Sequence, residues 1–165
     1  MPTEEVAKRS DKVLQKLLEI LDLSSISSLH TYLPLKGQNE VDTQPLLKYI
    51  WQEYPRVKTA TWQGAGEAAV SIWLDRRGNT SVAPINFQFD VIIVPVLGFD
   101  KANHRLGLGG GFYDRFLSSQ LKAKKIGLAY DLSLVNQGLP SERHDIALDC
   151  IVTETKTYLA SSKQR

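Results

Sequence analysis

The sequence lacks the features of several protein classes. It has one cysteine among 165 residues, so it forms no internal disulfide and builds no cysteine-rich zinc site. Its purely apolar runs are only a few residues long, too short to cross a bilayer. The charged N-terminal residues 1–12 contain no apolar signal-peptide core. We therefore expect a cytoplasmic protein with no membrane partner.

A strong excess of one charge is also missing. Twenty Lys and Arg residues face 18 Asp and Glu residues, which leaves a net charge of +2. This balance gives no reason to expect nucleic acid as a partner. Apolar residues make up 42% of the chain and charged residues 23%, which is ordinary for a folded protein. We expect a monomer with one domain over residues 1–165 and a core that needs no structural metal.

Helical and strand patterns alternate along the chain, which indicates an α/β sheet that is at least partly parallel. Residues 91–94 are apolar on both faces, as in a central strand covered by helices. Pro95 has no N–H group, so we expect strand pairing to fail there. We expect helices over residues 3–21, 45–54 and 112–121, and strands over 28–33, 57–62, 68–74, 91–94, 126–130 and 150–152.

A glycine-dense loop links the strand at 91–94 to the helix at 112–121. In open α/β sheets, ligands bind beyond the carboxyl ends of the strands. Glycines let a backbone approach a ligand closely, and the following helix N-terminus presents unpaired N–H groups to an anion. Arg105 adds a possible bidentate contact. The loop is neither a Walker loop nor a GxGxxG fingerprint, so a tight turn that packs the helix on the sheet is an alternative. Its glycines are Gly107, Gly109, Gly110 and Gly111.

Two aspartates are candidate magnesium ligands. Asp114 lies in the first turn of the helix after the glycine loop, and Asp145 lies just before the last expected strand. Magnesium bound to phosphate takes one or two protein carboxylates and keeps several waters. Two alternatives remain open: Asp114 stabilises its own helix N-terminus, and Asp145 is a solvated loop residue paired with Arg143.

The remaining candidates have simpler interpretations. The three histidines show no metal-ligand spacing, and we expect His30 to be packed within the sheet. His104 and His144 flank the two candidate loops within reach of a substrate, but we expect neither to be catalytic. Trp62 belongs either to the core or to a pocket wall. Cys150 lies in an apolar strand, where a thiol is usually inert.

The segment Val91–Leu117, VIIVPVLGFDKANHRLGLGGGFYDRFL, resembles the signature of the 5-formyltetrahydrofolate cyclo-ligases, also called methenyltetrahydrofolate synthetases. Three other stretches agree with that family: YLPLKGQNEVDT, IGLAYDLSLV and LPSERHDIALDCIVTE. The likeness covers roughly two-thirds of the chain. The signature is much longer than the common short motifs, which makes it specific.

The resemblance implies a three-layer α/β/α fold with a mostly parallel sheet, like that of the ribose-5-phosphate isomerase and CoA-transferase group. It implies an enzyme that closes 5-formyltetrahydrofolate to 5,10-methenyltetrahydrofolate with ATP and Mg²⁺, releasing ADP and phosphate. Arg105 and Tyr113 would be catalytic, with Tyr113 beside the formyl group. Leu33 and Glu40 would contact the reduced folate, and Asp114 and Asp145 would hold Mg²⁺. The ATP phosphates would lie on Arg105, Leu106, Gly107, Leu108, Gly109, Gly110, Gly111, Phe112 and Tyr113.

Departures from the family pattern favour a second hypothesis, a non-catalytic paralogue that binds folate or nucleotide. Family members usually begin with a further helix whose Lys and Arg reach ATP, whereas the first helix here matches the family's second one. Lys8 and Arg9 do not occupy the expected pattern, and GNTSVAPINF replaces a Gly-Ile-x-Glu-Pro type segment. A third hypothesis is a small-molecule kinase or sugar-phosphate enzyme on the same fold, because fold alone does not determine function.

Overall fold

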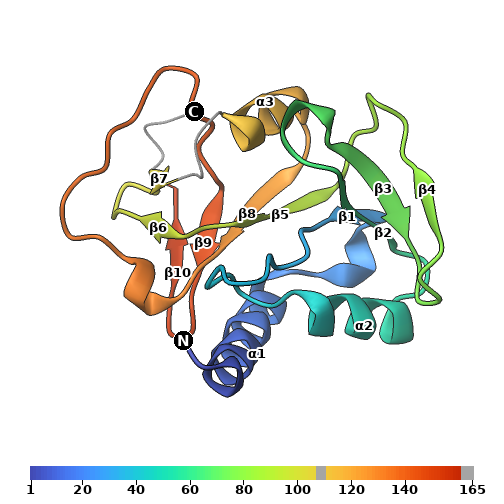
Figure 1. Cartoon of the computed structure of the whole chain (residues 1–165), viewed down its shortest axis with the longest axis horizontal. Helices are drawn as coiled ribbons and strands as arrows, with labels where there is room; N and C mark the ends of the chain where they lie inside the picture. Colours follow the sequence, from blue (N-terminus) through green and yellow to red (C-terminus); the bar gives the residue numbers. More distant parts are fainter. Residues whose placement is uncertain (107–110, 161–165) are drawn as a thin grey trace.

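The computed structural model describes residues 1–106 and 111–160. Within these ranges, one sheet has the strand order β10-β9-β8-β5-β1-β2-β3-β4 (Figure 1). The neighbours from β9 to β2 pair in parallel, and the pairs β10–β9, β2–β3 and β3–β4 are antiparallel. The sheet strands are β1 (Ser28–His30), β2 (Lys58–Gln63), β3 (Val70–Leu74), β4 (Thr80–Val82), β5 (Val91–Pro95), β8 (Lys124–Leu128), β9 (Cys150–Val152) and β10 (Thr157–Leu159).

Helices cover both faces of this sheet. Val91 and Ile93 of β5 belong to a core cluster with residues of α1 and α2, whereas Ile92 and Val94 belong to a second cluster with Leu117 of α3. The two sets separate because successive side chains of a strand point to opposite faces. Figure 1 shows α1 and α2 together on one side and α3 on the other. The predicted three-layer α/β/α class is confirmed. The helices are α1 (Thr3–Ile20), α2 (Gln44–Glu53) and α3 (Phe112–Ser119), with short 3-10 turns η1 (Leu23–Ser25), η2 (Gly66–Ala68) and η3 (Asp131–Ser133).

The expected end of strand pairing at Pro95 is wrong. Strand β5 extends to Pro95, which lies opposite Leu128 of β8. The next residue, Val96, donates its N–H to the Leu128 carbonyl at 3.0 Å. Because backbone N–H groups alternate in direction along a strand, the nitrogen of Pro95 faces β1 instead. Strand β1 has already ended at His30. The missing N–H of Pro95 therefore costs no hydrogen bond between β5 and β1.

The chain also contains strands that were not predicted. The strand expected to be the last, Cys150–Val152, is followed by β10, in which Leu159 lies opposite Cys150. This edge strand is half-exposed and carries little apolar signal. A small hairpin of β6 (Gly98–Phe99) and β7 (Arg105–Leu106) occupies the segment that was expected to be loop. In the described part of the chain, no helix is long and apolar enough to cross a membrane.

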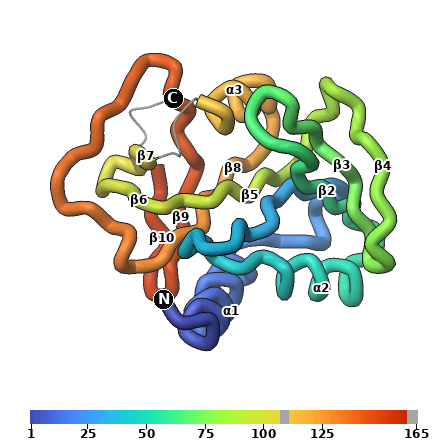
Figure 2. The backbone as a smooth tube through the Cα atoms, in the orientation of Figure 1, coloured from blue at the N-terminus to red at the C-terminus, as the bar shows by residue number. Residues whose placement is uncertain are grey.

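The parallel strands direct several loops to one end of the sheet. The segments that follow β1, β5 and β8 all leave from carboxyl ends, which face the same way because these strands are parallel. Figure 2 shows the loop after η3 curving around the β6–β7 hairpin at that end. The topology therefore brings together stretches that are far apart in the sequence, at the edge where open α/β sheets bind ligands.

A glycine in β8 provides a test of how the sheet packs against the loop that precedes β9. A Cβ atom on Gly127 would lie 2.7 Å from Leu148 Cδ1 and 2.7 Å from Val96 Cγ2. We expect Gly127→Ala to lower the free energy of unfolding by about 1–3 kcal/mol through overpacking, measured by urea denaturation. Gly138→Ala is the control, because in the described part of the chain no atom beyond its own neighbours along the sequence lies within 4 Å of its Cβ position. Equal stability of the two variants would contradict this packing.

Candidate functional site

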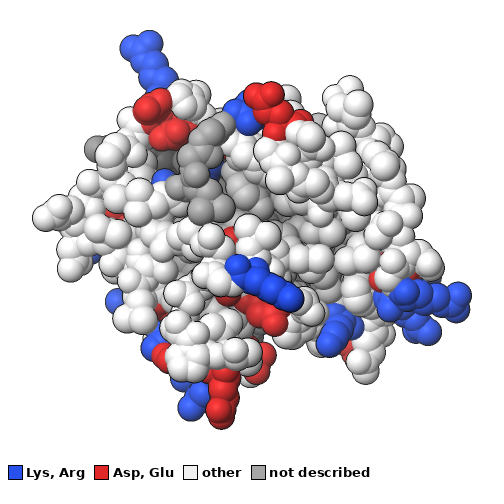
Figure 3. Space-filling view, in the orientation of Figure 1, with Lys and Arg blue, Asp and Glu red and all other residues white. Residues whose placement is uncertain are grey.

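A cavity of about 1220 Å³ lies at the carboxyl ends of the parallel strands. It exceeds the roughly 300–1,000 Å³ typical of a pocket for one small ligand, so it offers room for two. In the view of Figure 3, positive and negative side chains lie mostly around the outline of the molecule, and neither sign forms a continuous patch. The cavity is lined by residues within 32–40, 61–69, 95–106, 111–114 and 140–147.

The fold gathers the candidate site residues in this one cavity. Four residues of the glycine loop, Gly107, Leu108, Gly109 and Gly110, lie outside the described residues. Every other residue that the sequence analysis assigned to ATP, folate or Mg²⁺ contributes to the lining. These residues are Leu33, Glu40, Arg105, Leu106, Gly111, Phe112, Tyr113, Asp114 and Asp145.

Arg105 and Asp114 form a partly buried ion pair that joins three segments. Arg105 Nη2 donates to Asp114 Oδ1 at 2.5 Å, and Nη1 donates to the carbonyl of Ile146. The Ile146 N–H in turn donates to Asp114 Oδ1 at 2.9 Å. The two charged side chains are 10% and 19% exposed. This Arg105–Asp114–Ile146 clamp holds β7, the start of α3 and the loop before β9 against one another.

Asp145 directly precedes Ile146 of the clamp on the same loop. Its Oδ2 accepts the Glu142 N–H at 2.8 Å, and its Oδ1 lies 3.9 Å from His144 Nε2. Among the described residues, no group of three or more His, Cys, Asp or Glu is arranged to hold a metal ion. Asp114 and Asp145, the two expected magnesium ligands, both line the cavity.

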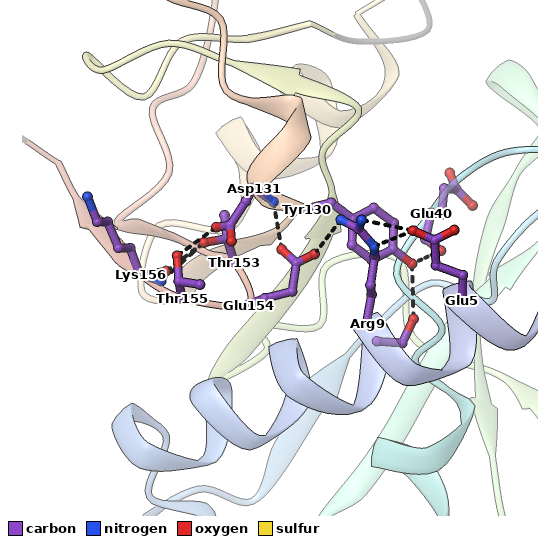
Figure 4. Close-up of polar contacts among 10 residues, drawn as sticks. Glu5, Arg9, Glu40, Tyr130, Asp131, Thr153, Glu154, Thr155 and Lys156 are labelled. Carbon is purple, nitrogen blue, oxygen red and sulfur yellow. Dashed lines mark hydrogen bonds and ion pairs between the residues drawn. The ribbon is translucent and has the colours of Figure 1, made fainter. Parts of the chain in front are cut away.

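Hydrogen bonds that involve Ser10 of α1 position the loop that carries Glu40. The Tyr130 hydroxyl donates to the Glu40 carbonyl at 3.0 Å and therefore accepts from Ser10 Oγ, also at 3.0 Å (Figure 4). Ser10 Oγ accepts the Asp42 N–H at 2.8 Å. The Glu40 carboxylate accepts the Leu35 N–H at 2.8 Å. Burial raises the pKa of Glu40 above its usual range, although the Leu35 bond opposes that shift.

Arg9 is engaged away from the cavity. It pairs with Glu5 at 2.8 Å and with Glu154 at 3.2 Å, and Glu154 also accepts the Asp131 N–H at 2.6 Å (Figure 4). These contacts link α1 to the segment after β9 and to η3. Arg9 does not contribute to the described cavity lining. The structure therefore assigns Arg9 to helix docking.

An aromatic wall closes the other side of the cavity. Trp62 Nε1 donates to the Tyr113 hydroxyl at 3.3 Å. The Trp62 ring lies 4.7 Å from Phe112 and 4.6 Å from Phe116, in edge-to-face contacts. Burial raises the pKa of Tyr113 well above its usual range, whereas the Trp62 bond acts to lower it. Tyr113 thus remains a neutral hydroxyl, and Trp62, for which two interpretations were open, belongs to the pocket wall.

His30 packs behind this wall, as expected from the sequence. It is fully buried, and its ring lies 4.5 Å from that of Trp62. Its Nε2 lies 3.2 Å from Ser71 Oγ, and its Nδ1 has no hydrogen-bond partner among the described residues. Burial lowers the pKa of His30 to about 3, so the ring is neutral. It is a packing residue of β1.

The sequence matches one known family over nearly all of its length. The profile of the 5-formyltetrahydrofolate cyclo-ligase family matches residues 1–154. The chain belongs to this family. The 5-formyltetrahydrofolate cyclo-ligase of Escherichia coli K12 is 33% identical over 142 residues, which cover 75% of this chain and 77% of that protein. The enzyme of the same name from Mycoplasma pneumoniae is 30% identical over 162 residues, covering 93% and 90%.

Solved structures agree with this cyclo-ligase assignment. A methenyltetrahydrofolate synthetase from Mycoplasma pneumoniae has a TM-score of 0.71 at 27% identity and covers 93% of this chain and 90% of its own. The synthetase of Aquifex aeolicus has a TM-score of 0.72 at 27% identity, covering 96% and 84%. The predicted family is confirmed, as is the prediction of an enzyme of the ligase class.

Some groups that build this candidate site gave no signal in the sequence. The main-chain N–H and carbonyl of Ile146 complete the clamp, but backbone groups leave no mark on residue type. Tyr32 lines the cavity while its hydroxyl donates to the Val41 carbonyl at 2.8 Å, so it also shapes the loop before α2. Their involvement depends on the path of the chain, which only the fold reveals.

The neutral state of His30 predicts a pH-dependent stability. The folded-state pKa of about 3 lies below the ordinary value of 6.5, so the unfolded chain binds this proton more readily. The His30 contribution is complete above pH 6.5 and is lost toward pH 3, at up to about 1.4 kcal/mol per pH unit. We expect His30→Gln to flatten the fall in unfolding free energy between pH 6 and 4, measured by urea denaturation. The exposed His144→Gln variant should keep the wild-type slope, and the same slope in all three proteins would refute the assignment.

Proposed function

We propose that this ligase closes 5-formyltetrahydrofolate to 5,10-methenyltetrahydrofolate with ATP, releasing ADP and phosphate. One observation carries the proposal: Arg105 and Gly111 line the same cavity as Leu33 and Glu40. The first pair belongs to the expected phosphate side and the second to the expected folate side. The names of the relatives also support a folate substrate.

The chemistry suits a cavity that positions two substrates. The oxygen of a formamide leaves poorly, so the reaction needs an activated derivative. Transfer of the γ-phosphoryl group to this oxygen makes phosphate the leaving group, and the neighbouring folate N10 then closes the ring with loss of its proton. Such steps require alignment and charge neutralisation and need no protein nucleophile.

The phosphate end combines a guanidinium with a helix terminus. Helix α3 begins at Phe112, directly after Gly111, which has a left-handed φ of 64°. Glycine adopts that conformation without strain, so the chain turns sharply into the helix. The first N–H groups of α3 have no intrahelical partners and can donate to phosphate oxygens. We assign Arg105 to the same phosphate oxygens. The clamp fixes the orientation of its guanidinium group.

The charge balance of the lining favours a nucleotide that carries a cation. Among the described lining residues, Glu40, Asp114, Glu142 and Asp145 are acidic, whereas Arg105 is the one Lys or Arg. A polyphosphate would be repelled by this set unless further positive charge came with it. Asp114 and Asp145 would hold Mg²⁺, which when bound neutralises phosphate charge and fixes the phosphate orientation.

At the folate end, neutral or partly buried side chains would orient the folate substrate. Tyr113 accepts a hydrogen bond from Trp62, which leaves its own proton for a substrate atom. Because burial disfavours its anion, Tyr113 cannot compete with the substrate as a nucleophile. We assign it to the formyl group. Glu40, whose carboxylate is fixed by the Leu35 N–H, would bind donor groups of the pterin.

A turnover assay tests the proposed function. We expect the wild-type protein with 5-formyltetrahydrofolate, ATP and Mg²⁺ to produce the methenyl absorbance near the ultraviolet–visible border. Asp114→Asn should lower kcat about 10–100-fold, because the neutral amide weakens both the Arg105 pair and cation binding. Asp11→Asn, on an exposed part of α1, is the matched control and should keep wild-type kcat. Folate binding without any wild-type turnover would instead support the non-catalytic alternative.

Arg105 should determine nucleotide affinity. We expect Arg105→Ala to weaken ATP binding by about 1.5–3 kcal/mol in calorimetry, because a charge-assisted contact and the clamp are both lost. Arg105→Lys should recover only part of this, since an ammonium cannot reproduce the guanidinium fork. Arg56→Ala, at an exposed position, controls for loss of net charge. Unchanged ATP affinity in Arg105→Ala would show that the clamp is only structural.

A further inference from the structure

A second polar pair, His104 and Asp100, lies beside the clamp in the hairpin between β6 and β7. His104 precedes Arg105 and lines the cavity, and its Nδ1 lies 2.9 Å from Asp100 Oδ2. Asp100 is 4% exposed, and both of its carboxylate oxygens accept hydrogen bonds from backbone N–H groups. Its Oδ2 also accepts the Leu139 N–H at 2.8 Å, and its Oδ1 accepts N–H groups of Ala102 and His104 at 2.9 and 3.0 Å. The carboxylate is thus rigidly placed behind the imidazole.

These contacts determine which nitrogen of His104 carries the proton. Burial acts to raise the pKa of Asp100, but the Leu139 and His104 hydrogen bonds outweigh it and hold the pKa below its usual range. An ionised carboxylate only accepts, so Nδ1 of His104 must donate. Nε2 remains as the second ring nitrogen, and it has no hydrogen-bond partner among the described residues. The side chain is 28% exposed, and the cavity is where that exposed part can meet a ligand.

Among the described residues that line the cavity with His104, Arg105 is the one Lys or Arg. Asp100 lies behind the ring and Arg105 follows it in β7, with its guanidinium already bonded to Asp114 and the Ile146 carbonyl. Asp114 on α3 is acidic, and Glu40 lines the cavity from the loop after β1. On the loop before β9, the charged or titratable lining residues are Glu142, His144 and Asp145. A ligand with several phosphate charges would therefore favour a proton on a histidine that already has a carboxylate behind it.

We propose that His104 is a further phosphate-binding residue of this cavity. It takes up a proton from solvent on Nε2 when a phosphate-bearing ligand binds, donates that N–H to a phosphate oxygen, and releases the proton when the ligand leaves. Asp100 is the positioning residue that fixes the ring and stabilises its charged form. The inference rests on the proposed binding of ATP. Because the bound state holds one more proton, the His104 contribution to affinity grows as pH falls.

Calorimetry with tripolyphosphate, ADP and adenosine, all in the presence of Mg²⁺ and in buffers of different ionisation enthalpy at one pH, tests this role. Phosphates exchange protons themselves, so the readout is the difference between wild type and variant. His104→Asn is the key variant, because its side-chain amide can replace Nδ1 against Asp100 and preserve the hairpin while Nε2 is removed. We expect it to bind tripolyphosphate and ADP roughly 10- to 100-fold more weakly, with about one proton less taken up. Adenosine binding should not change.

Two further variants separate charge from structure. His104→Gln offers a neutral donor near the position of Nε2, so it should restore part of the affinity without the proton uptake. Asp100→Asn removes the charge that supports the imidazolium and should reduce the proton uptake. Unchanged affinity and proton uptake in His104→Asn, with weakened ATP binding in Arg105→Ala, would overturn this inference and leave the proposed function standing. Failure of the wild type to bind either phosphate ligand would overturn both.

Discussion

The carboxylate of Asp114 is the point on which the site depends. Its Oδ1 receives the Arg105 guanidinium and the Ile146 N–H, so one atom ties a hairpin, a helix start and a distant loop together. These groups are mostly shielded from water, which strengthens the ion pair relative to an exposed one. An unpaired Arg105 or Asp114 there would be costly, so the three segments are held in mutual register. The cavity keeps its shape because its walls share this contact.

The two walls of the cavity differ in their physical character. One is an edge-to-face aromatic cluster around Trp62 that includes the neutral Tyr113, with the buried, neutral His30 behind it. The other wall carries carboxylates and Arg105. An apolar wall gives a flat heterocycle surface to contact, whereas the charged wall suits phosphate and a divalent cation.

Sequence patterns located the central elements well and the edges poorly. The apolar run of β5, the start of α1 and Pro45 at the start of α2 are strong local signals, and these elements lie close to where they were expected. Strand β10 is only three residues long and half-exposed, so little distinguishes it from a loop until it pairs with β9. The prediction that pairing ends at Pro95 was wrong for a related reason. A missing N–H donor disrupts pairing only where a neighbouring strand is still present on that side.

The amino-acid sequence was sufficient for the family, the layered α/β class and the candidate site residues, because these follow from a long specific motif and from local periodicity. Only the tertiary structure decided the partners of those residues. That Arg105 bonds Asp114 and the Ile146 carbonyl, that Arg9 docks α1 through Glu154, and that Asp100 orients His104 are outcomes of chain path. The physical reason is that hydrogen bonding and burial are set by neighbours in space, which no spacing along the chain specifies.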